Sequence, residues 1–232
     1  MVTALILSGG TGKRLGSEIP KQYIEVAGKP IIIYCLEAIC ASNNIDAFQI
    51  VADSAWEDQI HSWMNKYNLI QKFHGFSTPG ETRQLSIYSG LKDIAEFADD
   101  EDLVFIHDAA RPFLSEDLVG RCVVAAKGHD GVLPVLPMKD TIYLSEDGKA
   151  ISSLLDRKQV FAGQAPEVFV LGKYMEANTR LIKSGEIKMI NGSTEPAILA
   201  GMDIAMINGD ESNIKITTMS DLNHFKRMMK DN

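Results

Sequence analysis

The sequence predicts an α/β fold in which a mostly parallel sheet is covered by helices on both faces. Short β-rich apolar runs alternate with longer stretches of helical periodicity, and this order is typical of parallel sheets. No Pro-, Gly- or Ser-rich linker interrupts the 232 residues, of which 45% are hydrophobic. We therefore expect a single domain over residues 1–232, built around one substantial core.

Local signals predict the elements of the N-terminal part in order. Strands are expected at the apolar runs 2–7, 48–52, 103–107 and 132–136. Helices are expected at 30–41, which begins with a proline, at 54–67, where Ser54 and Glu57 have capping-box spacing, and at 82–94 and 115–127.

The stretch from 139 to 160 breaks this alternation. The β-prone runs 141–144 and 150–154 flank the turn signal Asp147-Gly148, which predicts a hairpin. We expect residues 139–160 to form an inserted β-arm that projects from the domain. Beyond the arm we expect a helix within 167–185, a last strand at 213–217 and a closing helix at 220–230.

Polar clusters follow three of the predicted strands, at Ser8–Arg14, His107–Arg111 and Pro137–Thr141. Ligands of parallel sheets bind beyond the carboxyl ends of the strands. We therefore expect these clusters to contribute to one shared site.

The first cluster opens the sequence SGGTGKRLG, from Ser8 to Gly16, which is typical of a phosphate-binding loop. The P-loop pattern would place its first glycine at Leu7, and the dinucleotide pattern would place its third at Leu15, so both are excluded. What remains is a glycine-rich turn with Lys13 and Arg14, followed by Lys21. Glycines let backbone N–H groups approach phosphate, and three cations suit a triphosphate. The alternative is a tight turn with solvated cations.

Composition argues against several classes of function. With 23 basic and 31 acidic residues the net charge is −8, which disfavours nucleic-acid and anionic-membrane partners. Cys35, Cys40 and Cys122 fit neither a disulfide framework nor a zinc site, which indicates a reducing compartment. Because no signal-peptide or membrane-spanning pattern is visible, we expect a cytoplasmic protein.

Six segments resemble, in order, the cytidylyltransferases that handle methylerythritol phosphate and ribitol phosphate. They lie between Leu7 and Leu222, and they read LSGGTGKRLGSEIPKQY, GETRQLSIYSGL, VFIHDAARPF, LPMKDTI, DRKQVFAGQAPEVF and NIKITTMSDL. The most diagnostic parts are HDAARP and PKQ. The resemblance implies a Rossmann-like, three-layer nucleotidyltransferase fold, CTP as substrate, Mg²⁺ or another divalent cation as cofactor, and release of pyrophosphate. It also implies a homodimer whose β-arms reach the partner's active site.

The same resemblance implies roles for individual residues by matching position. The nucleotide would be wrapped by Ser8, Gly9, Gly10, Thr11 and Gly12, with Gly80, Glu81 and Ser86 on cytosine and ribose. The triphosphate and the transition state would be held by Arg14, Lys21 and Lys215. Asp108 and Arg111 would face substrate and metal, with Asp108 as the metal ligand. Thr141 and Arg157 would bind the acceptor phosphate of the neighbouring subunit, Arg157 being the fourth catalytic residue.

Simpler interpretations of several residues stay open. Asp108 and Arg111 would then only pair with each other at a strand end, and Arg157 would be a solvated arm charge. We expect His107 to pack or hydrogen-bond rather than to catalyse, and Glu167 to lie on the exposed polar surface. Trp56 and Trp63 lie seven residues apart on one predicted helix, which favours packing over base stacking.

The acceptor half departs from the methylerythritol pattern. Ala165-Pro166-Glu167 stands where that branch has Thr-Pro-Gln, and NGSTEPAILAG does not restore its Thr-Asp-acidic motif. We therefore expect the acceptor to be another open-chain polyol phosphate, such as glycerol or ribitol phosphate, used for a capsule or a teichoic-acid-like polymer. Methylerythritol phosphate in isoprenoid biosynthesis is the alternative. A catalytically inactive nucleotide-binding scaffold and a sugar-phosphate uridylyltransferase are further alternatives.

Overall fold

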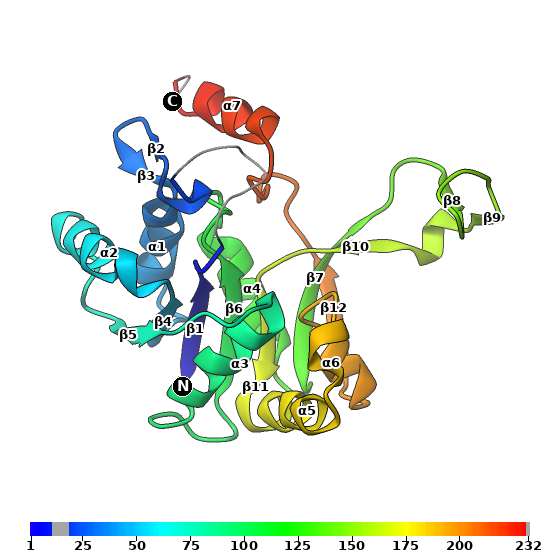
Figure 1. The fold of residues 1–232 in the computed structure, drawn as a ribbon, viewed down its shortest axis with the longest axis horizontal. Coiled ribbons are helices and arrows are strands. Elements are labelled where there is room, and N and C mark those ends of the chain that lie inside the picture. The colour runs from blue at the N-terminus through cyan, green and yellow to red at the C-terminus, as the bar shows by residue number, and fades with distance from the viewer. Residues whose placement is uncertain (11–18, 231–232) are drawn as a thin grey trace.

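A computed structural model describes residues 1–10 and 19–230 (Figure 1). In this part of the chain the main sheet has eight strands, in the order β10-β7-β11-β6-β1-β4-β5, with β12 paired to β7. The strands that run in parallel are β1 (Val2–Leu7), β4 (Ala47–Val51), β5 (Phe73–Ser77), β6 (Leu103–Asp108), β7 (Gly131–Pro137) and β12 (Ile204–Asn208). The antiparallel strands are β10 (Phe161–Gly163) and β11 (Glu167–Val170), which pair along the same edge of β7. The mostly parallel sheet expected from the sequence is thus confirmed.

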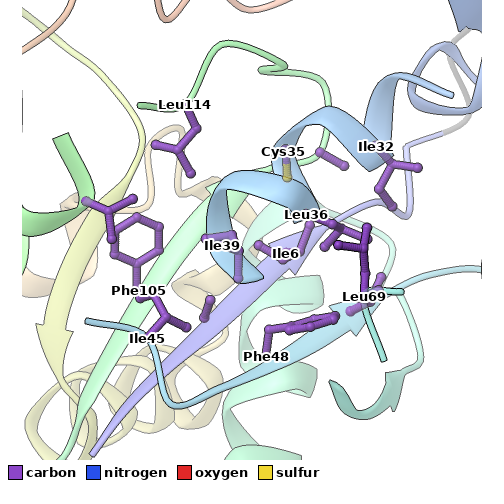
Figure 2. Packing of buried hydrophobic residues seen from close by; sticks show 14 of the residues in the cluster. Ile6, Ile32, Cys35, Leu36, Ile39, Ile45, Phe48, Leu69, Phe105 and Leu114 are labelled. Carbon is purple, nitrogen blue, oxygen red and sulfur yellow. The ribbon is translucent and has the colours of Figure 1, made fainter. Parts of the chain in front are cut away.

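Helices cover both faces of this sheet and give it three layers. One face is packed by α1 (Ile31–Ala41), α2 (Ser54–Lys66) and α4 (Glu116–Ala125), and the other by α3 (Arg83–Ile94), α5 (Leu171–Ser184) and α6 (Glu195–Leu199). Successive side chains of a strand point to opposite faces, so Ile6 of β1 packs in the first core cluster and Leu5 in the second. Figure 2 shows Ile6 of β1 close to Leu36 and Ile39 of α1.

Side-chain caps fix where several helices begin. Thr82 and Ser115 accept backbone hydrogen bonds at the starts of α3 and α4, and Thr218 does so for α7 (Met219–Met228). The predicted start of α2 at Ser54 is confirmed, but the expected capping box of Ser54 and Glu57 is wrong. Asp53, in extended backbone, accepts a hydrogen bond from the Ala55 amide at 3.0 Å and so caps the helix, which leaves Ser54 as its first residue.

Short elements complete the description. The 3-10 helix η2 (Lys21–Tyr23) and the small hairpin of β2 (Glu25–Val26) and β3 (Lys29–Pro30) precede α1. The predicted arm contains the hairpin of β8 (Ile142–Leu144) and β9 (Ser153–Leu155), followed by the 3-10 helix η3 (Arg157–Gln159). Figure 1 shows it projecting from the body beyond β7 and β10. A further 3-10 helix, η4 (Glu186–Met189), follows α5. Within the described ranges, no helix has the length and apolar character that a membrane crossing requires.

The expected strand at 213–217 is wrong. This segment has no regular secondary structure and lies outside the sheet. It is held by the loop that follows β6, where the Ile216 amide donates to the Ala110 carbonyl at 2.9 Å. Sequence reasoning instead missed β12, whose residues are exposed or only half-buried and therefore give a weak strand signal. It also missed β5 and the antiparallel strand β11, which separates β6 from β7.

Candidate active site

The backbone that leaves β1 is fixed by side chains of η2. The amide of Gln22 donates to the carbonyls of Ser8 and Gly10 at 2.6 and 2.8 Å, and Gln22 is buried. The Ser8 hydroxyl lies 2.9 Å from the hydroxyl of Tyr23, whose ring packs 4.5 Å from that of Trp56. The expected packing role of this tryptophan is confirmed. Gln22 of the PKQ sequence and the Tyr23 that follows it therefore anchor the start of the predicted nucleotide loop to the aromatic residues of α2.

A second loop lies directly against this one. A Cβ atom added to Gly9 would stand 2.6 Å from Cβ of Pro79, so only a glycine permits this approach. A Cβ atom on Gly80 would stand 2.4 Å from Cβ of Leu85, and the Gly80 amide donates to the Ser86 hydroxyl at 3.0 Å. The side chain of Glu81 is exposed and pairs with Lys188 at 3.2 Å. Two of the nucleotide segments expected from the sequence thus meet at the end of β1.

A charged cluster surrounds Asp108 at the end of β6. Leu7 and Asp108 are register partners in the adjacent strands β1 and β6, so the cluster lies beside the first loop. The Asp108 carboxylate lies 2.9 Å from Lys215 Nζ, 3.3 Å from Arg83 Nη2 and 3.5 Å from Arg111 Nε. Burial opposes ionisation of Asp108, but these three cations outweigh it and hold the pKa of the carboxyl well below its usual range. Asp108 is therefore an ionised, nearly buried carboxylate that gathers cations.

The segment 213–217, which follows β12, supplies part of this cluster. Lys21 Nζ donates to the Ile216 carbonyl at 2.6 Å, one residue from Lys215, and Arg111 Nη1 donates to the Asn213 carbonyl at 2.7 Å. The backbone of 213–216 therefore places Lys21, Lys215 and Arg111 in one region. The simple pairing of Asp108 with Arg111 does occur, but as one contact within a larger cation cluster.

Two members of the site were missed from the sequence. Arg83 contacts Asp108, and its Nη1 donates to the Ser193 hydroxyl at 2.5 Å. The sequence feature that could have identified Arg83 is its place in the first turn of a helix, because the macrodipole disfavours positive charge there unless an anion lies close. The expectation that Glu167 lies on the surface is wrong: the residue is only 7% exposed, because β11 inserts into the sheet beside β6.

The arm carries the remaining acceptor candidates away from this cluster. Thr141 and Arg157 are exposed, and Arg157 Nη1 donates to the Lys139 carbonyl at 2.9 Å. The polar cluster expected after β7 does not join the other two: Lys139 pairs with Glu211 at 2.5 Å and the chain continues into the arm. Thr11, Gly12 and Arg14 lie outside the described residues, so their roles stay predictions.

His107 lies beneath the cluster and is fully buried. Burial lowers its pKa to about 4, with Asp108 opposing and Arg111 adding to the shift, so the imidazole is neutral at pH 7. Its Nε2 lies 3.4 Å from the Arg111 carbonyl, and its ring lies 6.3 Å from that of Phe105. These contacts agree with the packing role that we expect from the sequence.

Comparison with known proteins identifies the family of this chain. A family model described as 2-C-methyl-D-erythritol 4-phosphate cytidylyltransferase matches residues 2–231. The chain belongs to this family. Similar proteins include a ribitol-5-phosphate cytidylyltransferase of Streptococcus agalactiae serotype III (strain NEM316), 32% identical over 98% of this chain and 95% of the relative. A 2-C-methyl-D-erythritol 4-phosphate cytidylyltransferase of Clostridium beijerinckii is 33% identical, over 96% of this chain and 95% of the relative.

Solved structures agree with this assignment. The crystal structure of 4-diphosphocytidyl-2C-methyl-D-erythritol synthase from Anaerococcus prevotii has a TM-score of 0.85 and 25% identity, covering 99% of this chain and 96% of that one. The predicted Rossmann-like nucleotidyltransferase fold is confirmed. The chain is accordingly a CTP-dependent cytidylyltransferase.

The donor set for a divalent cation is small in the described part of the chain. No group of three His, Cys, Asp or Glu side chains gathers there in a way that could hold a metal. Mg²⁺ in such enzymes is held by one or two carboxylates together with substrate phosphates and water. Asp108 fits this pattern as a single protein ligand. Its described ionic partners are Arg83, Arg111 and Lys215 rather than further carboxylates, so these side chains do not form a metal site by themselves.

Proposed function

We propose that this enzyme transfers CMP from CTP to the phosphate of an open-chain polyol phosphate, of ribitol or glycerol type, for cell-surface polymer synthesis. The products are a CDP-polyol and pyrophosphate. The observation that carries the proposal is the cation cluster of Lys21, Arg111 and Lys215, gathered at the carboxyl ends of β1 and β6. The ribitol-5-phosphate cytidylyltransferases among the relatives support the choice of acceptor.

The reaction requires the protein to position the two substrates and to neutralise phosphate charge. An oxygen of the acceptor phosphate attacks the α-phosphorus of CTP, a new P–O bond forms, and the bond to the bridging β-phosphate oxygen breaks. That attacking oxygen is already ionised near neutral pH, so no general base is needed. Lys21 and Lys215 align the triphosphate and neutralise the charge that spreads over it in the transition state. Arg14 is proposed to act with them.

The cofactor is proposed to be Mg²⁺ or another divalent cation. When bound it supplies further neutralisation of the phosphate charge, and Asp108 is the described residue that would contact it. The cationic side chains around Asp108 would also neutralise phosphate charge.

We also propose a homodimer formed through the β-arm. The arm exposes large apolar side chains, with Tyr143 55%, Ile151 67% and Leu154 65% exposed, which is a costly surface for a lone subunit. A partner covering this face would bring Thr141 and Arg157 to the neighbouring acceptor phosphate. Mixing Arg157→Ala and Lys21→Ala subunits tests this arrangement, because a verified heterodimer then keeps one intact site. Absence of regained activity in that heterodimer would contradict it.

The second candidate acceptor is 2-C-methyl-D-erythritol 4-phosphate, which the matching family model favours. The deciding experiment measures pyrophosphate release from CTP and UTP with D-ribitol 5-phosphate, glycerol 3-phosphate and 2-C-methyl-D-erythritol 4-phosphate. We expect the highest kcat/KM with CTP and an unbranched polyol phosphate. A preference for the methyl-branched acceptor would establish the second candidate. A preference for UTP, or binding of CTP without any turnover, would overturn the proposal.

A further inference from the structure

Glu167 lies in a buried polar site beside the cation cluster, together with Ser193 and Thr194. Its carboxylate accepts hydrogen bonds from the hydroxyls of Ser193 and Thr194, the second at 3.1 Å. Ser193 and Thr194 lie just before α6, whereas Glu167 opens β11, so side chains from two distant parts of the chain converge here. Buried carboxylates are rare because desolvation disfavours their charge. Packing in the core alone therefore does not explain why a carboxylate lies at this position.

Arg83 connects this site with Asp108. The same guanidinium nitrogen, Nη2, lies 3.8 Å from Glu167 Oε1 and 3.3 Å from Asp108 Oδ1. One side chain thus contacts both carboxylates, and it is 34% exposed, so a ligand can reach the Arg83 guanidinium from solvent. An acceptor whose phosphate lies beside Arg111 would extend its carbon chain past Arg83 toward Glu167.

The chemistry of the three side chains matches hydroxyl groups. An ionised carboxylate only accepts hydrogen bonds and has about four lone-pair sites, of which Ser193 and Thr194 use two. The pKa of Glu167 is raised, because burial disfavours its charge, and the Arg83 guanidinium and the Ser193 hydroxyl offset only part of this rise. A hydroxyl of a polyol can donate to the remaining sites and accept from Arg83. A methyl group in the same place can do neither, and leaves buried polar groups unpaired.

We infer that Glu167, held by Ser193, Thr194 and Arg83, is a specificity-determining residue that binds acceptor hydroxyls and selects an unbranched polyol phosphate over a methyl-branched one. This inference rests on the proposed function and refines it. It assigns the phosphate of the acceptor to the Asp108 side of Arg83 and the polyol chain to the Glu167 side.

The test compares Glu167→Gln and Glu167→Asp with the wild type. Gln keeps the size of the side chain but replaces an acceptor oxygen with a donor, and Asp keeps the charge on a shorter stem. The measured quantity is the ratio of kcat/KM for D-ribitol 5-phosphate to that for 2-C-methyl-D-erythritol 4-phosphate, together with the KM for CTP. Glu176→Gln is the matched control, because Glu176 is an exposed carboxylate of α5 that pairs with Arg180.

We expect Glu167→Gln to lower this ratio at least tenfold with the KM for CTP within twofold, and Glu167→Asp to fall between it and the wild type. A folded Glu167→Gln enzyme with an unchanged ratio would overturn the inference while leaving the proposed function intact. If that variant shows no cooperative melting transition, Glu167→Asp and Ser193→Ala decide, and each should lower the ratio at least threefold. A wild-type enzyme that forms a CDP product from no unbranched polyol phosphate would overturn the proposed function and the inference with it.

Discussion

Gly9 is the position where a single methyl group should disturb the nucleotide site most directly. In Gly9→Ala the new Cβ would lie 2.6 Å from Cβ of Pro79, whereas carbon atoms in contact are about 3.5–4.0 Å apart. One of the two loops must therefore move by roughly 1 Å. Such overpacking costs about 1–3 kcal/mol, which lowers Tm by about 2–12 °C in a protein of this size. A 1 Å displacement of positioned groups lowers catalysis about 100-fold.

The matched control is Gly10→Ala, because an added Cβ there meets no described atom within 4 Å. The assays are thermal unfolding without ligand and kcat/KM for CTP from pyrophosphate release. We expect the loss of stability in Gly9→Ala only, together with the larger loss in kcat/KM. Equal melting temperatures for the two variants would refute the reasoning, since they would show that the loops are not in contact in solution.

Lys215→Ala should lower kcat about 100-fold or more in steady-state pyrophosphate release, because it removes a positioned cation, while Lys226→Ala on the exposed face of α7 should not. The pKa of His107 falls from 6.5 to about 4 on folding, so its stabilisation is complete above pH 6.5 and is lost as the pH falls toward 4. Urea unfolding should show about 2 kcal/mol of this loss at pH 5, and His107→Asn should lack that component. Thr218→Ala removes the N-cap of α7 and should cost about 1 kcal/mol, seen as a Tm lowered by about 2–4 °C, and an unchanged Tm would contradict the capping role.

The sequence predicted the part of the site that depends on strand ends. Ser8 follows β1 and Asp108 ends β6, and these strands are neighbours in the sheet, so their termini converge wherever the intervening helices pack. Glycine spacing alone excludes the P-loop and the dinucleotide-binding loop. The family resemblance then supplied Lys21 and Lys215, which are far apart in the chain but meet through the backbone of the segment that contains Ile216.

What the sequence could not predict depends on long-range contacts. Residues 213–217 alternate like a strand, yet backbone hydrogen bonding to Ala110 holds them outside the sheet. Glu167 is a charged residue at the head of the short apolar run Val168–Val170, so its own side chain gives no sign of burial. Only the insertion of β11 between β6 and β7 encloses it. Local patterns report which face of an element is apolar, but not which partner that face meets.

Asp108 explains how an acidic protein can hold a concentrated cation site. The chain carries a net charge of −8, and closely placed cations would repel one another in the absence of ligand. The carboxylate of Asp108 offsets that repulsion for Arg83, Arg111 and Lys215, and so keeps them in place before CTP binds. Because preorganised charges need no rearrangement in the transition state, they stabilise it more than mobile side chains would. Among these described residues, three cations meet only the carboxylates of Asp108 and Glu167, so the cluster retains a positive excess that a triphosphate can neutralise.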